Sequence, residues 1–351
     1  MEALNRILAD MPQKYPRAAL RDYIKLIYQN EFGCGHLIAD ADSFRRQLAE
    51  EAAMARPGRY AAEPIGNGYA RVYLQNACAL GLSCETIAAM ALRSAEDGHG
   101  TQEGLRAKLS LLPQLCAAGT LPFSVSDCRT QLDAYQKAGC LPPHHSERYR
   151  AAYAPAYRVA GAYEAQHLAL FAAIDRALAA TAGPVLVGID GPCASGKTTL
   201  AEQIRQCYDC NVFHADDFFL RSEQRTPERL NTPGGNMDRE RLEQEVLRPL
   251  REGKSVLYRP YSCKTQSIAP GSMIPFRRLN IIEGSYALHP ELRRYYALKA
   301  VLCVPANTQW QRLAQRESAA SLERFRTRWI PLEQSYSVHT GLLSCANLIF
   351  A

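Results

Sequence analysis

One short segment constrains the fold of this chain more than any other. It runs Gly191-Pro-Cys-Ala-Ser-Gly-Lys-Thr198, with the glycine spacing of a loop that joins a strand to a helix. The continuous apolar run 185–189 before it is typical of a strand buried on both faces of a parallel sheet. The run 199–206 after it has the apolar periodicity of a helix. This part of the chain is therefore expected to be an α/β domain.

The composition of this loop also indicates a chemistry. Glycines let successive backbone N–H groups turn toward one point, where the helix N-terminus adds partial positive charge, so a phosphate fits there. Lysine can then reach further phosphate oxygens, and threonine can bind magnesium. The candidate nucleotide contacts are Gly191, Ala194, Ser195, Gly196, Lys197, Thr198 and Thr199, with Thr198 also the candidate metal ligand. The alternative is a glycine-rich turn that only joins strand to helix.

A change of pattern at Gly183-Pro184 predicts two domains, 1–181 and 182–351. In the first, apolar residues recur at helical spacing, as in 17–29, so a mainly α-helical domain is expected. In the second, short apolar runs alternate with helical ones, which predicts a doubly wound parallel sheet. The further strand-like runs lie at 210–215, 255–258, 279–284, 298–304 and 346–350.

Two of these predicted strands end in acidic residues, at Asp216 and Glu283. Ligands bind at the carboxyl ends of strands in open α/β sheets. Transfer of a phosphoryl group to an alcohol needs a base for the hydroxyl proton and an acid near the metal. Asp216 is the candidate base, and Glu283 is the candidate acid on the metal side. The alternative is that each carboxylate caps the helix that follows.

Basic residues follow the last predicted strands. Arg312 and Arg316 are four residues apart and so share one helix face, and further arginines stand at 324, 326 and 328. Such a cluster can fold over a triphosphate as a lid. It can equally line a solvated helix face.

Together these segments resemble a known family. GPCASGKTT, HADDFF, PGGNMDRERL, YRPYSC, IIEGSYALHPELRRYYALKAVLCV and QRLAQRE make the chain, from Pro184 to its end, similar to the uridine kinase and phosphoribulokinase family of P-loop kinases. The resemblance implies ATP- and Mg²⁺-dependent transfer to a hydroxyl of a small metabolite. It implies Asp216 as base, Glu283 beside the metal, and Arg312 and Arg316 in the lid. A nucleoside is the leading expectation for the acceptor, and GTP in place of ATP stays open.

The chain departs from the uridine kinases at one segment. They carry a Y-D-F segment followed by a substrate-contacting histidine, whereas this sequence has Tyr261-Ser-Cys-Lys264. Asp217, Tyr261 and Lys264 are the candidate substrate contacts. For Tyr261 the alternative is packing under the edge of the sheet.

The first domain resembles no characterised enzyme. Its polar loops at 31–36, 97–100 and 142–150 are candidate binding segments, because binding residues favour loops. The segment from 142 to 163, rich in histidine, arginine and tyrosine, would suit a phosphate or nucleotide, or would serve as a polar linker. Two other functions therefore stay open: a nucleotide-dependent switch, and a bifunctional enzyme with a second activity in this domain.

Charge and composition restrict the class of ligand and the cellular compartment that we expect. The formal charge of +6 is dispersed, which favours an anionic ligand over a nucleic-acid groove. We see no signal-peptide pattern and no membrane-length apolar run, so a cytoplasmic protein without a membrane partner is expected. Cysteines should be reduced there, and the C-x-x-C pair at 207 and 210 lacks further zinc ligands. Homo-oligomer formation stays open.

Overall fold

The chain forms two compact units. The computed structural model describes residues 1–35, 40–262 and 264–351, and its contacts divide into Met1–Leu168 and Ala169–Ala351. The predicted boundary lay after residue 181, whereas the contacts assign helix α11 (Leu168–Ala180) from Ala169 onward to the second unit. The end of the predicted loop 31–36, His36, and position 263 of the Tyr261–Lys264 segment lie outside the described residues.

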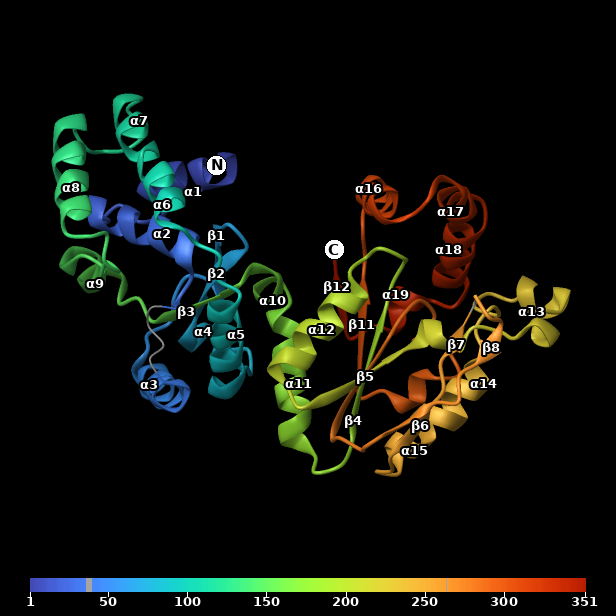
Figure 1. The fold of residues 1–351 in the computed structure, drawn as a ribbon. Coiled ribbons are helices and arrows are strands. Elements are labelled where there is room, and N and C mark those ends of the chain that lie inside the picture. Colours follow the sequence, from blue (N-terminus) through green and yellow to red (C-terminus); the bar gives the residue numbers. More distant parts are fainter. Residues whose placement is uncertain (36–39, 263) are drawn as a thin grey trace. The chain divides into compact units, whose positions relative to one another are not determined.

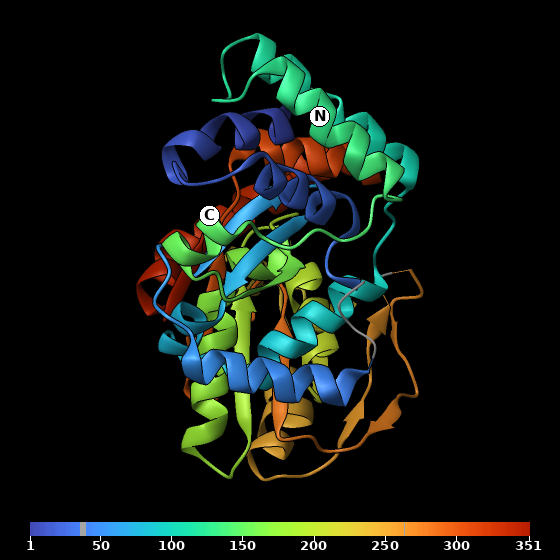
Figure 2. The ribbon, with the colours of Figure 1, turned by 90° about the vertical axis from the view of Figure 1, so that its left-hand side faces the viewer.

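The first unit is largely helical, and it also contains a three-stranded antiparallel sheet that the sequence analysis did not predict. Its order is β1-β2-β3, formed by Ala62–Gly66, Tyr69–Tyr73 and Tyr157–Gly161. Figure 2 shows this sheet with helices of the same unit on either side. The helices are α1 (Glu2–Lys14), α2 (Leu20–Phe32), α3 (Ala41–Met54), α4 (Leu74–Ala79), α5 (Cys84–Glu96), α6 (Gln102–Leu109), α7 (Leu111–Ala117), α8 (Val125–Lys137), α9 (Glu147–Tyr153) and α10 (Ala162–Gln166).

Part of the histidine- and tyrosine-rich segment lies in the interior of this unit: His145 and Tyr149 are buried, whereas His144, Arg148 and Arg150 are exposed. His145 Nδ1 lies 2.8 Å from Asp22 Oδ1, and His145 Nε2 lies 2.7 Å from the Tyr157 hydroxyl. Burial lowers the pKa of His145 to about 4, so the ring is neutral at pH 7. Arg71 is fully buried beside it, with both Nε and Nη2 donating to Gln29 Oε1. The segment thus satisfies buried polar groups within its own unit.

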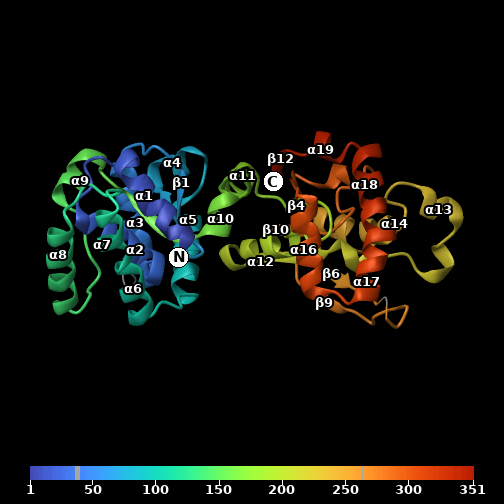
Figure 3. The same ribbon diagram turned by 90° about the horizontal axis from the view of Figure 1, so that it is seen from above.

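The second unit is the predicted doubly wound α/β domain. Its five-stranded sheet has the order β12-β11-β4-β10-β5, and every pair is parallel. Helices α11 and α12 lie on one side and α14 and α18 on the other, in both the front view and the view from above (Figures 1 and 3). The strands are β4 (Val185–Asp190), β5 (Cys210–His214), β10 (Leu279–Glu283), β11 (Leu298–Leu302) and β12 (Leu348–Phe350).

The remaining elements of this unit surround that sheet. The predicted strand at 255–258 forms, but as β6 (Val256–Tyr258) it pairs with β9 (Ser272–Ile274) in a separate two-stranded sheet. A second small sheet joins β7 (Tyr261–Ser262) to β8 (Ser267–Ile268). The helices are α12 (Lys197–Cys207), α13 (Pro227–Asn231), α14 (Arg239–Leu242), α15 (Arg248–Arg251), α16 (Ala306–Arg316), α17 (Ala319–Arg324), α18 (Ile330–His339) and α19 (Leu342–Cys345), and one-turn segments cover Ala215–Phe218, Ser222–Gln224, Glu243–Leu247, Arg293–Tyr295 and Phe325–Trp329.

Two further observations concern the described residues as a whole. Their cysteines are free thiols. Within the described ranges, we find no helix whose length and apolar character would let it cross a membrane.

Candidate functional site

The loop after β4 is built by backbone conformations that only small residues adopt easily. Gly191 has a φ of +144°, and a Cβ there would collide with the carbonyl oxygen of Leu302 on the neighbouring strand β11. Ala194 and Gly196 also have positive φ values, +58° and +102°. Helix α12 then begins at Lys197, with Gly196 as its N-cap. The predicted strand–loop–helix unit therefore forms.

Several polar groups of this loop could donate hydrogen bonds to an anion. Lys197 is buried, and its Nζ donates to the carbonyl oxygens of Gly191 and Pro192, both at 2.9 Å. The hydroxyl of Ser195 is buried without a hydrogen-bond partner among the described residues. Thr198 and Thr199 are exposed on the first turn of α12, where the helix dipole favours negative charge. These residues fit the phosphates of a nucleotide.

Glu283 links the loop to the next strand. Strand β10 lies between β4 and β5, with Glu283 paired in register with Ile189 and with His214. The buried carboxylate of Glu283 accepts a hydrogen bond from Thr198 Oγ1 at 3.0 Å, and its Oε1 lies 2.6 Å from His214 Nδ1. That contact raises the pKa of His214. The threonine hydroxyl and the carboxylate supply oxygen atoms, the kind of ligand that Mg²⁺ prefers.

Metal binding here would use these oxygens together with nucleotide phosphates. Among the described residues no group of three or more His, Cys, Asp or Glu side chains could hold a metal by itself. Thr198 and Glu283 still fit a magnesium ion whose other ligands are phosphates and water, which is how such sites are usually built.

Asp216 lies at the end of the adjacent strand β5, on the one-turn helix Ala215–Phe218. A Cβ added to Gly284 would lie 3.1 Å from Asp216 Oδ1 and 2.8 Å from the Ala215 Cβ, so the glycine after Glu283 lets the two strand ends approach. Asp216 retains solvent exposure, yet the surrounding protein raises its pKa to about 6 through desolvation. Lys197 opposes this effect, while Glu283 adds to it.

Two carboxylates that the sequence analysis did not single out, the buried Asp190 and the partly buried Glu333, hold the loop in shape. Asp190, the last residue of β4, accepts hydrogen bonds from Gly191 N, Tyr286 N, Leu288 N and the Tyr336 hydroxyl. The rule that acids at strand ends mark sites would have found it. Glu333 on α18 accepts from Cys193 N at 2.9 Å and from Ser285 Oγ at 2.8 Å. No local signal pointed to Glu333, because its partners are remote in sequence.

The two predicted lid arginines differ in their surroundings. Arg312 on α16 donates from Nη1 to the carbonyl oxygen of Ala194 at 2.9 Å, so it touches the loop. Gln309, one turn earlier, donates to the Cys193 carbonyl oxygen at 2.9 Å. Arg316 is half exposed and pairs with Glu317 at 3.3 Å. Only Arg312 of this pair contacts the loop among the described residues.

The candidate substrate contacts are engaged within the protein or exposed to solvent. Asp217 accepts a hydrogen bond from the Tyr258 hydroxyl. Tyr261 is buried, and its hydroxyl accepts from Arg225 Nη2 at 3.2 Å, which agrees with the packing alternative. Lys264 is exposed.

Comparisons with known proteins give matches of fold. No family model and no curated protein matches the chain. Among solved structures, a candidate uridine kinase from Bacillus stearothermophilus is 23% identical over 52% of this chain and 99% of its own, with a TM-score of 0.40. A candidate fructose transport system kinase from a Silicibacter species is 22% identical over 49% and 91%, with a TM-score of 0.39. D-glycerate 3-kinase from Cryptococcus neoformans var. grubii is 14% identical over 51% and 87%, with a TM-score of 0.37.

Proposed function

We propose that the second unit is an ATP-dependent phosphotransferase that moves the γ-phosphate to a hydroxyl of a small metabolite. One observation carries this proposal. The groups that the reaction needs lie at the carboxyl ends of three adjacent strands, β4, β10 and β5. These groups are the phosphate-binding Lys197, the oxygen pair of Thr198 and Glu283, and the carboxyl of Asp216. Ligands bind at that edge in open α/β sheets.

In this proposal each group has one role. The loop amides and Lys197 bind the phosphates, and the lysine exchanges its present carbonyl partners for phosphate oxygens. Thr198 and Glu283 hold magnesium, which neutralises charge that develops on the transferred group. Arg312, already at the loop, can turn toward the γ-phosphate.

Asp216 is the proposed base. Its pKa of about 6 leaves the carboxylate ionised at pH 7 and still basic enough to accept a proton from the attacking hydroxyl. Neighbouring negative charge from Glu283 raises that basicity further. The acceptor would therefore place its hydroxyl beside Asp216, and a nucleoside remains our leading proposal for it.

The test is ADP release with ATP and magnesium against nucleosides, sugars, sugar phosphates, pantothenate and glycerate. We expect one class to stimulate turnover, and Lys197→Ala and Asp216→Asn each to reduce it by about 10²-fold or more. Asp209→Asn is the matched control, because Asp209 is an exposed carboxylate of the same unit. GTP replaces ATP in a parallel series.

A nucleotide-dependent switch is the competing function for the same loop. It needs no base, so Asp216→Asn would leave its ATP binding and any basal turnover unchanged. ATP binding by the wild type without stimulation by any acceptor, and an Asp216→Asn variant indistinguishable from it, would favour the switch over the phosphotransferase.

A further inference from the structure

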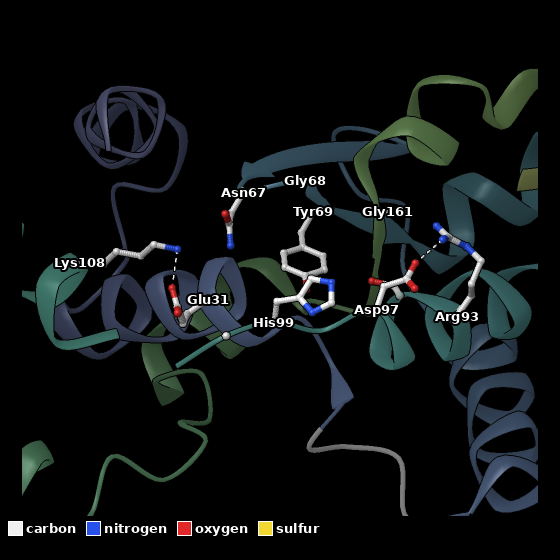
Figure 4. A pocket seen from close by; sticks show the side chains of 11 residues that line it. Glu31, Asn67, Gly68, Tyr69, Arg93, Asp97, His99, Lys108 and Gly161 are labelled. Atoms are coloured by element: carbon white, nitrogen blue, oxygen red, sulfur yellow. Dashed lines mark hydrogen bonds and ion pairs between the residues drawn. The ribbon is translucent and has the colours of Figure 1, made fainter. Parts of the chain in front are cut away.

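The first unit contains a pocket that the proposed phosphotransferase does not use. Its volume is about 560 Å³, which lies within the range of small-molecule sites. Figure 4 shows side chains that reach it from the end of α2, the β1–β2 turn, α5 with the loop that follows it, and α6. Glu31 in its wall belongs to the predicted binding loop 31–36, and Asp97, His99 and Gly100 belong to the predicted loop 97–100.

Two ion pairs lie at opposite ends of this pocket (Figure 4). At one end Lys108 Nζ is 2.6 Å from Glu31 Oε2, and at the other Arg93 Nη1 is 2.6 Å from Asp97 Oδ2. Arg93 also contacts the buried carboxylate of Glu164. Three carboxylates therefore accompany two cations, and no positive charge is left in excess. A phosphate or carboxylate ligand would meet these acids as well as the bases, which disfavours an anion.

Backbone close to Glu31 fixes its orientation. The amide of Thr101 donates to Glu31 Oε1 at 2.7 Å. A Cβ at Gly104 would collide with the same carboxylate, and one at Gly100 would lie 2.9 Å from the Glu31 carbonyl carbon. The chain thus uses glycines to bring the loop against this acid. The Lys108–Glu31 pair is held in place before any ligand arrives.

Hydrogen-bonding capacity remains between the ion pairs. Ser94, which lines the pocket, is 2% exposed, and its hydroxyl has no partner among the described residues. Asn67 donates through Nδ2 to the Asn30 carbonyl oxygen at 2.7 Å, which leaves its own carbonyl oxygen as an acceptor. The rings of Tyr69 and His99 also line the pocket (Figure 4). Donors and acceptors therefore stand next to apolar ring surface.

We propose that this pocket binds a neutral, polyhydroxylated small molecule of the class of a sugar or nucleoside. A hydroxyl group donates and accepts at once, so it can bridge the two members of an ion pair without displacing either. Aromatic rings offer a surface for the C–H face of a sugar or for a base. The site is independent of the phosphate-binding loop, and the inference goes beyond the proposed phosphotransferase.

The test is hydrogen–deuterium exchange of the full-length protein with D-ribose, D-glucose, myo-inositol, uridine, inorganic phosphate or serine. We expect at least one neutral compound to protect peptides from 93–108, and phosphate and serine to leave them unchanged. Protection by ribose and uridine alike would mean sugar recognition, and protection by uridine alone would mean nucleoside recognition. The proposal would be overturned if none of the neutral compounds protected this segment. It would equally be overturned if phosphate or serine alone protected it.

Variants keep this site separate from the phosphate-binding loop. Asp97→Asn should weaken binding of the protective compound about tenfold, because a charge-assisted hydrogen bond is lost. Asp97 is largely exposed, so the variant should fold. His144→Ala, at an exposed histidine outside the pocket, should leave binding unchanged, as should Lys197→Ala in the second unit. Unaltered affinity in Asp97→Asn, or protection confined to peptides around 191–217, would also overturn the proposal.

Discussion

Replacing Asp216 by asparagine is expected to stabilise the second unit while it removes the proposed base. The folded protein raises the pKa of this carboxyl from its usual 3.8 to about 6, so the folded state holds the proton more tightly than the unfolded state. Above about pH 6 the ionised carboxylate therefore opposes folding. An amide of nearly the same shape carries no charge to desolvate.

The magnitude follows from the size of this shift. For a fully buried group, that change in pKa would lower the free energy of unfolding by roughly 3 kcal/mol at neutral pH. Asp216 keeps solvent access, and solvent screens its charge, so we expect a gain of about 1 kcal/mol in the variant. The extra stability of Asp216→Asn over the wild type should be complete above about pH 6 and fall to about half near pH 5. It should vanish below 3.8, the pKa of the carboxyl in the unfolded state.

Urea unfolding followed by tryptophan fluorescence measures this effect directly. Both tryptophans of the chain, Trp310 and Trp329, lie in the second unit, so their emission reports the unfolding of that unit. Asp209→Asn serves as control, because its side chain is 82% exposed. The reasoning is refuted if Asp216→Asn is no more stable than the wild type at about pH 7.5 while the control is unchanged.

Three further outcomes can be measured on the same protein. Arg312→Ala should lower kcat at least about tenfold, because it removes a cation that contacts the loop. Arg316→Ala should change kcat less than about twofold, because Arg316 pairs with Glu317 instead. Equal effects of the two substitutions in steady-state assays would contradict this difference. Gly284→Ala should lower the free energy of unfolding of the second unit by about 2–4 kcal/mol, as measured by urea unfolding. The reason is that Gly284 has a φ of +144° and that the new Cβ would collide with Ala215. A decrease of less than about 1 kcal/mol would contradict this packing. The kcat/KM should fall about tenfold per pH unit below about pH 6, where Asp216 becomes protonated, and a profile flat down to about pH 4.5 would argue against that base.

The first unit shows where sequence reasoning fell short. Its strands are short and lie between helices, so helical periodicity dominated the analysis. Asn67-Gly68, both with positive φ, is a local signal of a hairpin between β1 and β2. The third strand, Tyr157–Gly161, pairs with a strand far earlier in the chain, and such a partner cannot be read from local pattern.

Sequence by itself determined the five strands of the second unit's parallel sheet, the loop at 191–198 and the acids at two strand ends, because glycine spacing, apolar runs and strand ends are local properties. Tertiary structure alone decided which groups meet. It brought Glu333 to the loop from 140 positions away, and it placed Arg312 against the loop while Arg316 pairs with Glu317. It also set the pKa of Asp216, because desolvation and neighbouring charges depend on what packs around a carboxyl and not on its place in the chain.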